Sequence, residues 1–306
     1  MGKLLFGIVV LTYNSEDVVV DCIRKLKSAL ENVPHEIVVV DNASTDHSAE
    51  VVRAAFPDVR VLQAEKNLGY ARGNNLGGME LADSCSYLAF VNPDVGVERD
   101  TMEKMRQVLE EHSDAGCVGG VPLINGKRSR SCFRNKPTFI QKLVLYGTWR
   151  DLPILRRLLR NFADELEKAH FTEPTVTQPV YAVSGACLLF AADVYRRIGG
   201  FDEHTFLFQE EFIVSERLRR IGYAVYGCPD AVYAHAHGHS VRRRLLHAQR
   251  VFIHSEQYLI RAYYGWNWPL RASMLALRYL DWTLHACVVE LNKVLKSLPG
   301  KRGNPR

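Results

Sequence analysis

Residues 87–95 read YLAFVNPDV, an apolar run that ends abruptly at Asn92-Pro93-Asp94. Such a run is typical of a strand buried on both faces, and a proline cannot continue the hydrogen bonding of a central strand. The carboxylate of Asp94 must then be hydrated or paired. Because Asn, Pro and Asp are common turn residues, a simple turn is the leading explanation for this segment taken alone.

Three further strand-like runs precede this one, and helix-like patterns separate them. The runs are LLFGIVVL (4–11), EIVVV (36–40) and VRVLQAE (59–65), and the helical patterns cover 15–31, 46–55, 69–83 and 101–111. Strict alternation of strand and helix predicts an α/β fold in which a mostly parallel sheet carries helices on both faces.

The composition is that of an ordinary globular protein. The chain has 306 residues, 47% of them apolar and 24% charged, which argues against disorder. Its seven cysteines are scattered without a C-x-x-C pair, so we expect no disulfide framework or zinc knuckle and favour a reducing, cytoplasmic environment. The N-terminal stretch runs straight into a strand pattern without a small-residue cleavage site, unlike a signal peptide.

The basic residues are concentrated in two segments. Residues 242–306 hold twelve Lys or Arg and three acids, and Lys127–Arg160 holds ten basic residues and one acid. Such clusters are often solvated faces, but they also occur on surfaces that bind acidic lipid, phosphorylated substrates or nucleic acid. Neither cluster contains a nucleic-acid recognition motif, so we expect no nucleic-acid partner.

Polar residues follow each of the four predicted strands, at the edge where α/β sheets bind ligands. They are Thr12-Tyr13-Asn14, DNASTD (41–46), Asn67-Leu68-Gly69 and Asn92-Pro93-Asp94. The first loop lacks the G-x-G-x-x-G of dinucleotide sites, and the chain contains no P-loop. Any one of these loops could simply cap a helix, but four on one edge predict a ligand site.

The motif series as a whole resembles the family 2 glycosyltransferases, which are inverting enzymes of the GT-A fold, and most closely bacterial rhamnosyltransferases of cell-surface polysaccharide synthesis. The matching segments are VVLTYN (9–14), VVVDNASTD (38–46), NLGYARGNNLG (67–77), FVNPDV (90–95), SGACLLF (184–190), GGFDE (199–203) and FLFQEEF (206–212). The resemblance implies a GT-A catalytic domain over 1–241, with a nucleotide-sugar half (1–126) and an acceptor-binding and catalytic half (127–241).

The family pattern also assigns residues to the donor site. Those expected to bind a nucleoside-diphosphate sugar are Thr12, Tyr13, Asn14, Asp41, Asn67, Gly69, Asn74 and Asn92. The family's D-x-D motif falls on 92–94, with Asn92 in place of the first acid. The resemblance thus implies that Asp94, with His235 and His237, holds Mg²⁺ or Mn²⁺ at the diphosphate. A metal-free alternative, in which histidine and Arg242–Arg244 contact phosphate directly, stays open.

On the acceptor side, the family's acidic pair falls on Glu210-Glu211. By resemblance Glu211 is the general base that deprotonates the acceptor hydroxyl, a Glu where the family usually has Asp. The residues expected at the acceptor are Gly185, Ala186, Asp202 and Glu210. Taken without their context, Glu210 and Glu211 would be ordinary acids of a first helical turn.

The region 242–306 lies outside the resemblance, and its pattern predicts a basic amphipathic helical segment. Apolar residues recur at 277, 280, 284, 288, 291 and 295, interrupted by Arg278, Asp281, His285 and Glu290, so the segment cannot span a bilayer. We expect these helices to lie on a membrane surface, to pack on the catalytic domain or to form a homo-oligomer.

The sequence therefore predicts a glycosyltransferase that acts in the cytoplasm, with candidate peripheral attachment to the inner face of the plasma membrane. It would move a sugar from dTDP-rhamnose or a UDP-hexose to a hydroxyl of a glycan acceptor, lipid-linked by resemblance. The open alternative is a carbohydrate- or nucleotide-binding module on a catalytically degenerate scaffold, which the Asn at 92 and the Glu at 211 would suit.

Overall fold

The computed structural model describes residues 4–147, 153–236 and 245–297. The strands are β1 (Leu4–Thr12), β2 (His35–Asp41), β3 (Arg60–Gln63), β4 (Cys85–Val91), β5 (Val95–Val97), β6 (Ala115–Ile124), β7 (Lys127–Arg128), β8 (Phe133–Arg134), β9 (Phe171–Thr172), β10 (Gln178–Val180), β11 (Cys187–Ala191) and β12 (Ala224–His235). The helices are α1 (Val19–Ala29), α2 (Ser48–Ala55), α3 (Gly69–Leu81), α4 (Thr101–Glu111), α5 (Phe139–Leu145), α6 (Pro153–His170), α7 (Ala192–Arg197), α8 (Glu210–Arg220), α9 (Leu245–Leu259), the π-helix η2 (Ile260–Tyr264) and α10 (Trp268–Ser297).

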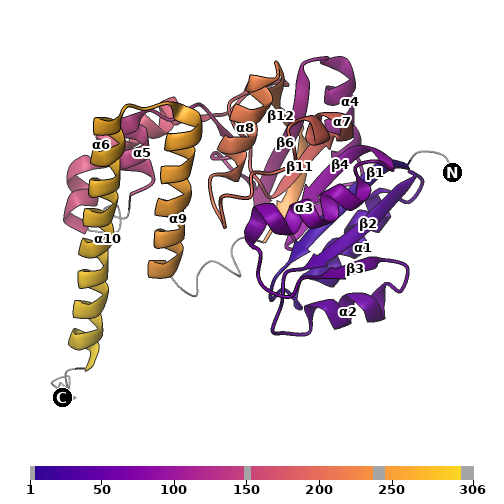
Figure 1. Cartoon of the computed structure of the whole chain (residues 1–306), viewed down its shortest axis with the longest axis horizontal. Helices are drawn as coiled ribbons and strands as arrows, with labels where there is room; N and C mark the ends of the chain where they lie inside the picture. The colour runs from indigo at the N-terminus through magenta and orange to yellow at the C-terminus, as the bar shows by residue number, and fades with distance from the viewer. Residues whose placement is uncertain (1–3, 148–152, 237–244, 298–306) are drawn as a thin grey trace, which may run out of the picture.

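Ten strands of the described chain form one sheet, and its main path runs β10-β12-β6-β11-β4-β1-β2-β3. The pairs β1–β2, β1–β4, β2–β3 and β6–β12 are parallel, which confirms the mostly parallel sheet expected from the sequence. Strand β11 is antiparallel to both of its neighbours, β4 and β6. In Figure 1 this sheet occupies the right-hand half of the molecule, and α3 lies across its front.

The alternation of side chains along the strands divides the core between the two faces of the sheet. On β1, Ile8 and Val10 belong to the core on the side of α1, α2 and α4, whereas Val9 belongs to the core on the side of α3, α7 and α8. Both sides are buried, and so the strands read as continuous apolar runs. Helices on both faces are therefore confirmed.

The boundaries of the predicted helices shift where loop hydrogen bonds replace helical ones. The pattern over 15–31 gives a helix only from Val19, because the N–H groups of Val18 and Val19 both donate to the carbonyl of Ser15 in a turn. The second helix begins at Ser48, and Asp46 accepts a hydrogen bond from the Ser48 N–H at 3.0 Å.

The C-terminal region is helical as expected, and Figure 1 shows α9 and α10 side by side, grouped with α5 and α6 away from β1–β3. No helix within the described residues combines the length and apolar content needed to cross a membrane. The boundary expected between residues 241 and 242 lies outside the described residues.

The orientation of α10 differs from the one its apolar spacing suggests. Leu280 and Leu284 are exposed, whereas Arg278 and His285, which interrupt the apolar pattern, are buried. Arg278 faces inward because Glu256, a buried acid on the neighbouring helix α9, pairs with it through two hydrogen bonds of 2.6 and 3.0 Å. An unpaired buried carboxylate costs more free energy than the exposure of Leu280 and Leu284 to solvent.

Candidate active site

The loops after β1 and β2 are joined by direct hydrogen bonds at the ligand-binding edge of the sheet. Asn14 adopts a left-handed conformation with φ of 53°, which allows its N–H to donate to Ser44 Oγ at 3.0 Å. Its side-chain oxygen accepts from the Thr45 N–H at 2.7 Å. The carboxylate of Asp41 is buried and accepts from the Ser44 N–H at 3.2 Å. The two predicted donor loops thus form one ordered surface.

The hydroxyl of Thr12 is a candidate ligand contact within this surface. Thr12 is fully buried, and its Oγ1 has no hydrogen-bond partner among the described residues. A buried polar atom left without a partner is destabilising unless a ligand or water satisfies it. Tyr13, the next residue, is 38% exposed and lies open to a stacking ligand.

The loop after β3 is tied to the loop after β2 by Asn42, a residue the sequence analysis did not select. Its side chain donates to Asn67 Oδ1 at 3.1 Å and accepts from the Leu68 N–H at 2.8 Å. Gly69 opens α3 with φ of 79°, and a Cβ there would lie 2.1 Å from the carbonyl oxygen of Phe206. Glycine is therefore required for the donor loop to touch the segment that precedes Glu210.

The side chain of Asn74 is turned into its own helix. Asn74 is buried, and its amide donates to the carbonyl of Tyr70 at 3.1 Å. Of the predicted donor residues, the structure thus gathers those of the first three loops at one edge, whereas Asn74 lies within α3.

The fourth loop brings together two of the predicted metal ligands. Asn92-Pro93-Asp94 forms a turn closed by the Val95 N–H donating to the Asn92 carbonyl at 3.1 Å. Strand β5 then pairs with β12, with Val95 opposite His235, and this places His235 Nε2 3.4 Å from Asp94 Oδ1. The sequence offered a turn or a ligand site as alternatives, and the segment is a turn that holds Asp94 against a histidine.

Asp94 and His235 could hold a cation that takes its remaining ligands from the substrate and from water. Within the described residues no group of three or more His, Cys, Asp or Glu side chains could enclose a metal ion, and His237 lies outside those residues. One carboxylate and one imidazole leave most positions to diphosphate oxygens and water. Mg²⁺ and Mn²⁺ sites at nucleotides are commonly of this open type.

The two glutamates at the start of α8 have different surroundings. Glu211 Oε1 lies 3.3 Å from Arg134 and accepts from the Gly185 N–H at 3.2 Å. The close approach depends on glycine, because a Cβ on Gly185 would lie 2.9 Å from that same oxygen. The predicted residues Gly185 and Glu211 are thus in contact, and Ala186 joins them by accepting from the Asn92 N–H at 2.9 Å.

Glu210 is buried beside this ion pair. Its Oε1 has no hydrogen-bond partner within the described parts of the chain. Burial, with the charge of Glu211 as a second cause, raises the pKa of Glu210 to about 8. Near neutral pH Glu210 is therefore protonated, whereas Glu211 is the member of the pair that contacts Arg134.

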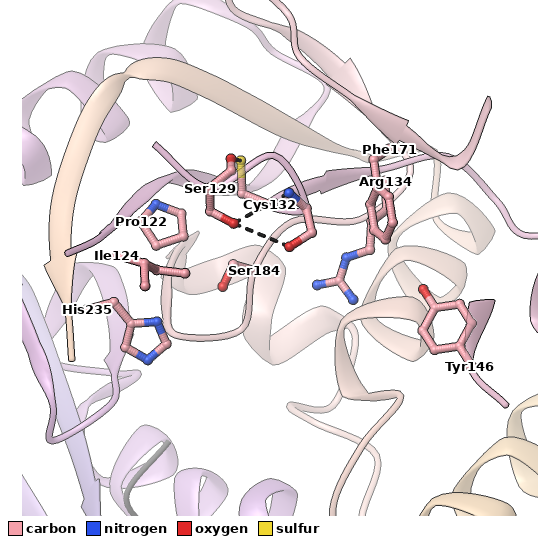
Figure 2. Close-up of a pocket in the computed structure, with 10 residues that line it drawn as sticks. Pro122, Ile124, Ser129, Cys132, Arg134, Tyr146, Phe171, Ser184 and His235 are labelled. Atoms are coloured by element: carbon pink, nitrogen blue, oxygen red, sulfur yellow. Dashed lines mark hydrogen bonds between the residues drawn. The ribbon is translucent and has the colours of Figure 1, made fainter. Parts of the chain in front are cut away.

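A pocket of about 250 Å³ lies next to these residues. Its lining residues are Pro122, Ile124, Ser129, Ser131, Cys132, Arg134, Tyr146, Phe171, Ser184 and His235. Figure 2 shows His235 at one end and Tyr146 at the other, with the Arg134 guanidinium pointing into the space between Ser184 and Tyr146. The pocket thus extends from the Asp94–His235 pair to the arginine that contacts Glu211.

Asp202, which we expected at the acceptor, is not part of this arrangement. It is buried, and its carboxylate accepts hydrogen bonds from Tyr258 at 2.8 Å and from Tyr263. Although burial opposes it, these bonds lower the pKa of Asp202 to about 2. The carboxylate is already occupied, so the geometry assigns Asp202 to the attachment of α9 and η2 and not to an acceptor contact.

Besides Asn42, the sequence analysis missed Arg134 and Tyr70. Arg134 was one of ten basic residues in its cluster, and nothing in the local sequence distinguishes it. Tyr70 lies inside the quoted motif NLGYARGNNLG, and its hydroxyl donates to the Gly185 carbonyl at 2.8 Å. An aromatic residue directly after the loop glycine was the one signal that could have identified it.

The buried acid at 210 predicts a pH-dependent stability. Between its ordinary pKa of 4.5 and about 8 the folded chain retains a proton that the unfolded chain releases, so Glu210 lowers stability increasingly as pH rises through this window. Replacing Glu210 with Gln removes this effect. The variant should match the wild type near pH 4 and exceed its free energy of unfolding by about 4 kcal/mol near pH 8. Urea unfolding across this pH range measures the difference, and a constant offset would contradict a buried titrating acid.

Comparison with known proteins assigns the family. Residues 7–166 match the family described as Glycosyl transferase family 2. N-acetylglucosaminyl-diphospho-decaprenol L-rhamnosyltransferase of Mycobacterium tuberculosis (strain ATCC 25618 / H37Rv) is 27% identical over 293 residues, which cover 89% of this chain and 90% of that protein. O-antigen chain rhamnosyltransferase WbaN of Salmonella anatum is 23% identical over 223 residues, 72% of this chain and 62% of that one.

A solved structure shares the fold. The mannosyltransferase PcManGT from Pyrobaculum calidifontis, in complex with GDP-Man and Mn²⁺, has a TM-score of 0.54 and 21% identity, covering 97% of this chain and 77% of that one. At this identity the likeness supports the GT-A fold alone. The family match extends over more than half of the sequence, and the chain therefore belongs to glycosyltransferase family 2.

Proposed function

We propose that this glycosyltransferase moves a sugar from a nucleoside-diphosphate sugar to a hydroxyl of a glycan acceptor with inversion at the anomeric carbon. The observation that carries the proposal is the position of Glu211, held by Arg134 and Gly185 beside a pocket that reaches His235, the partner of Asp94. A base and a candidate diphosphate site beside the same pocket are the groups needed for an acceptor hydroxyl to displace the diphosphate in one step.

The donor is assigned to the edge formed by the loops after β1, β2 and β3. The buried hydroxyl of Thr12 and the exposed ring of Tyr13 supply a hydrogen bond and a stacking surface for a nucleotide. The relatives named as rhamnosyltransferases favour dTDP-rhamnose as the first donor to test, with UDP-hexoses second.

A divalent cation, Mg²⁺ or Mn²⁺, is assigned to Asp94 and His235, which lie 3.4 Å apart. When bound it would neutralise the charge that develops on the departing diphosphate. The Mn²⁺ named with PcManGT supports testing manganese first.

Glu211 is assigned the proton transfer. As the acceptor oxygen attacks the anomeric carbon, its proton passes to the Glu211 carboxylate and the bond to the diphosphate breaks on the opposite face. One displacement of this kind inverts the configuration. Arg134, which donates to Glu211 Oε1 at 3.3 Å and also lines the pocket, would hold the carboxylate in place for this step.

The pocket itself is assigned to the acceptor. Its volume of about 250 Å³ lies below the usual range for drug-sized ligands, which indicates room for one sugar ring. The hydroxyls of Ser129, Ser131 and Ser184 and the guanidinium of Arg134 offer the polar contacts that sugar hydroxyls or a phosphate require.

The lipid-linked form of the acceptor is supported by the exposed side of α10. Between residues 272 and 287 every exposed residue is uncharged, and together they form what we call the α10 face: Ser273, Leu275, Ala276, Tyr279, Leu280, Thr283, Leu284 and Cys287. A continuous uncharged face of this kind marks an interaction surface. Because residues 242–306 carry nine more basic than acidic groups, its proposed partner is the surface of an anionic bilayer.

Replacing Glu211 with Gln tests the enzyme against the alternative of a binding module. The amide cannot accept the proton, so transfer should fall by about a hundredfold or more while donor affinity stays within a few-fold. Donor binding is measured by calorimetry and transfer by release of nucleoside diphosphate. Glu210→Gln is the matched control, because Glu210 is already neutral near pH 7 and the amide imitates that form. If the wild type released no nucleoside diphosphate with any acceptor tried, the binding module would be favoured. If Glu211→Gln transferred sugar at the normal rate, another residue would have to be the base.

Replacing Asp94 with Asn tests the metal assignment. Asp94 is partly exposed at the sheet edge, so the variant should fold normally. It should lose the Mn²⁺-dependent part of donor binding, and turnover should fall by about two orders of magnitude or more. Full wild-type activity in excess chelator would overturn the assignment and shift the charge role to histidine and arginine.

Binding to vesicles tests the proposed membrane contact. The wild type should sediment with vesicles that contain phosphatidylglycerol and bind far less to pure phosphatidylcholine. Leu280→Asp combined with Leu284→Asp should abolish the binding, because a charge has to be desolvated on insertion. Met79→Asp, an exposed apolar residue of α3, is the control. A dimer in solution that the same double variant disrupts would identify a second copy of the chain as the occupant instead.

A further inference from the structure

The turn before the two glutamates holds two consecutive residues in an unfavourable conformation. Phe208 and Gln209 have φ of 75° and 72°, in the left-handed region that non-glycine residues rarely adopt. Such a conformation is strained, and it persists only where surrounding contacts impose it. Because Gln209 is the N-cap of α8, its torsions fix the direction in which Glu210 and Glu211 leave the turn.

One face of α9 supplies contacts that impose this conformation. Ser255 donates to the carbonyl of Leu207 at 2.7 Å, and the ring of Phe252 packs edge-on against Phe208 with centroids 5.8 Å apart. Glu256 lies on the same face, at the spacing that places helical residues side by side.

A buried charge cluster continues from this face to the turn. Lys142 on α5 donates to Gln209 Oε1 at 3.1 Å and to Glu256 at 3.4 Å, and Arg278 on α10 donates to Glu256 and, at 2.6 Å, to the Lys142 carbonyl. All three charged side chains are 2% exposed or less. This burial lowers the pKa of Lys142 to about 8. Charges so deeply buried hold one geometry, because displacement of a partner leaves an uncompensated charge.

We propose that Lys142 and Gln209 are positioning residues for the transfer reaction, and that α9 and the buried cluster fix the strained turn so that Glu211 points at the acceptor hydroxyl. This inference rests on the proposed role of Glu211 as the base. It also gives the C-terminal helices a part in catalysis, although no residue of α9 or α10 touches Glu211 in the contacts described.

Two variants separate positioning from stability. Gln209→Gly removes the contact with Lys142 and also relieves a strained torsion, so the protein should be at least as stable as the wild type. Lys142→Met also removes the contact, and it leaves Glu256 paired with Arg278, so no unpaired charge is buried. For both variants we expect unchanged donor affinity and a transfer rate, at saturating donor and acceptor, at least about tenfold lower, because a small misplacement of a reacting group is costly.

Two further variants serve as rescue and control. Gln209→Glu keeps an oxygen for Lys142 and should restore most of the rate that Gln209→Leu, of similar size, loses. Asn125→Gly relieves a left-handed residue (φ of 51°) in the exposed turn between β6 and β7, and it should stabilise the protein without changing the rate.

The outcomes distinguish this inference from the proposed function. Wild-type transfer rates in Gln209→Gly and Lys142→Met, together with an inactive Glu211→Gln, would overturn the positioning role and leave the base in place. A fully active Glu211→Gln would overturn the base assignment, and with it this inference. A rate that falls only in proportion to lost stability would show that the cluster is merely structural.

Discussion

Strand β11 runs against both of its neighbours, and this reversal brings Gly185 and Ala186 to the edge where Glu211 and Asn92 lie. In a parallel sheet only the loops that follow the strands reach the ligand-binding edge. Because β11 is antiparallel, with Cys187 opposite Val91, the residues that precede it reach the same edge as the loop that follows β4. Gly185 and Ala186 therefore meet Asn92, and the missing side chain at Gly185 leaves the space that Glu211 occupies.

The sequence predicts the first half of the fold well because its strands are buried on both faces and its loops are polar. The same pattern, with the family motifs, predicts the meeting of Asp94 with His235 across 141 positions of the chain, which the pairing of β5 with β12 produces. Contacts made by residues outside the family motifs could not be predicted from the sequence. Arg134 reaches Glu211 from strand β8, 77 residues away in the chain, and only the packed structure distinguishes it from the other basic residues of its cluster.

The C-terminal helices show where periodicity fails. Apolar spacing along α10 predicts an amphipathic helix, and the structure has one, but the spacing does not say which face meets the protein. That is decided by Glu256, a residue on another helix, which requires Arg278 on the inner face. The contacts of Asp202 were equally beyond prediction, because the tyrosines that donate to its carboxylate are more than fifty residues away.

The buried charge cluster of Lys142, Glu256 and Arg278 limits which changes of sequence the fold can accept. These residues come from three helices in two separate stretches of the chain, one of which lies beside the acceptor pocket. If recombination exchanged one stretch without the other, a buried charge of the cluster could be left without its partner. A substitution that removes one of these charges therefore has to be matched by a substitution in the other stretch, so the two stretches are constrained together.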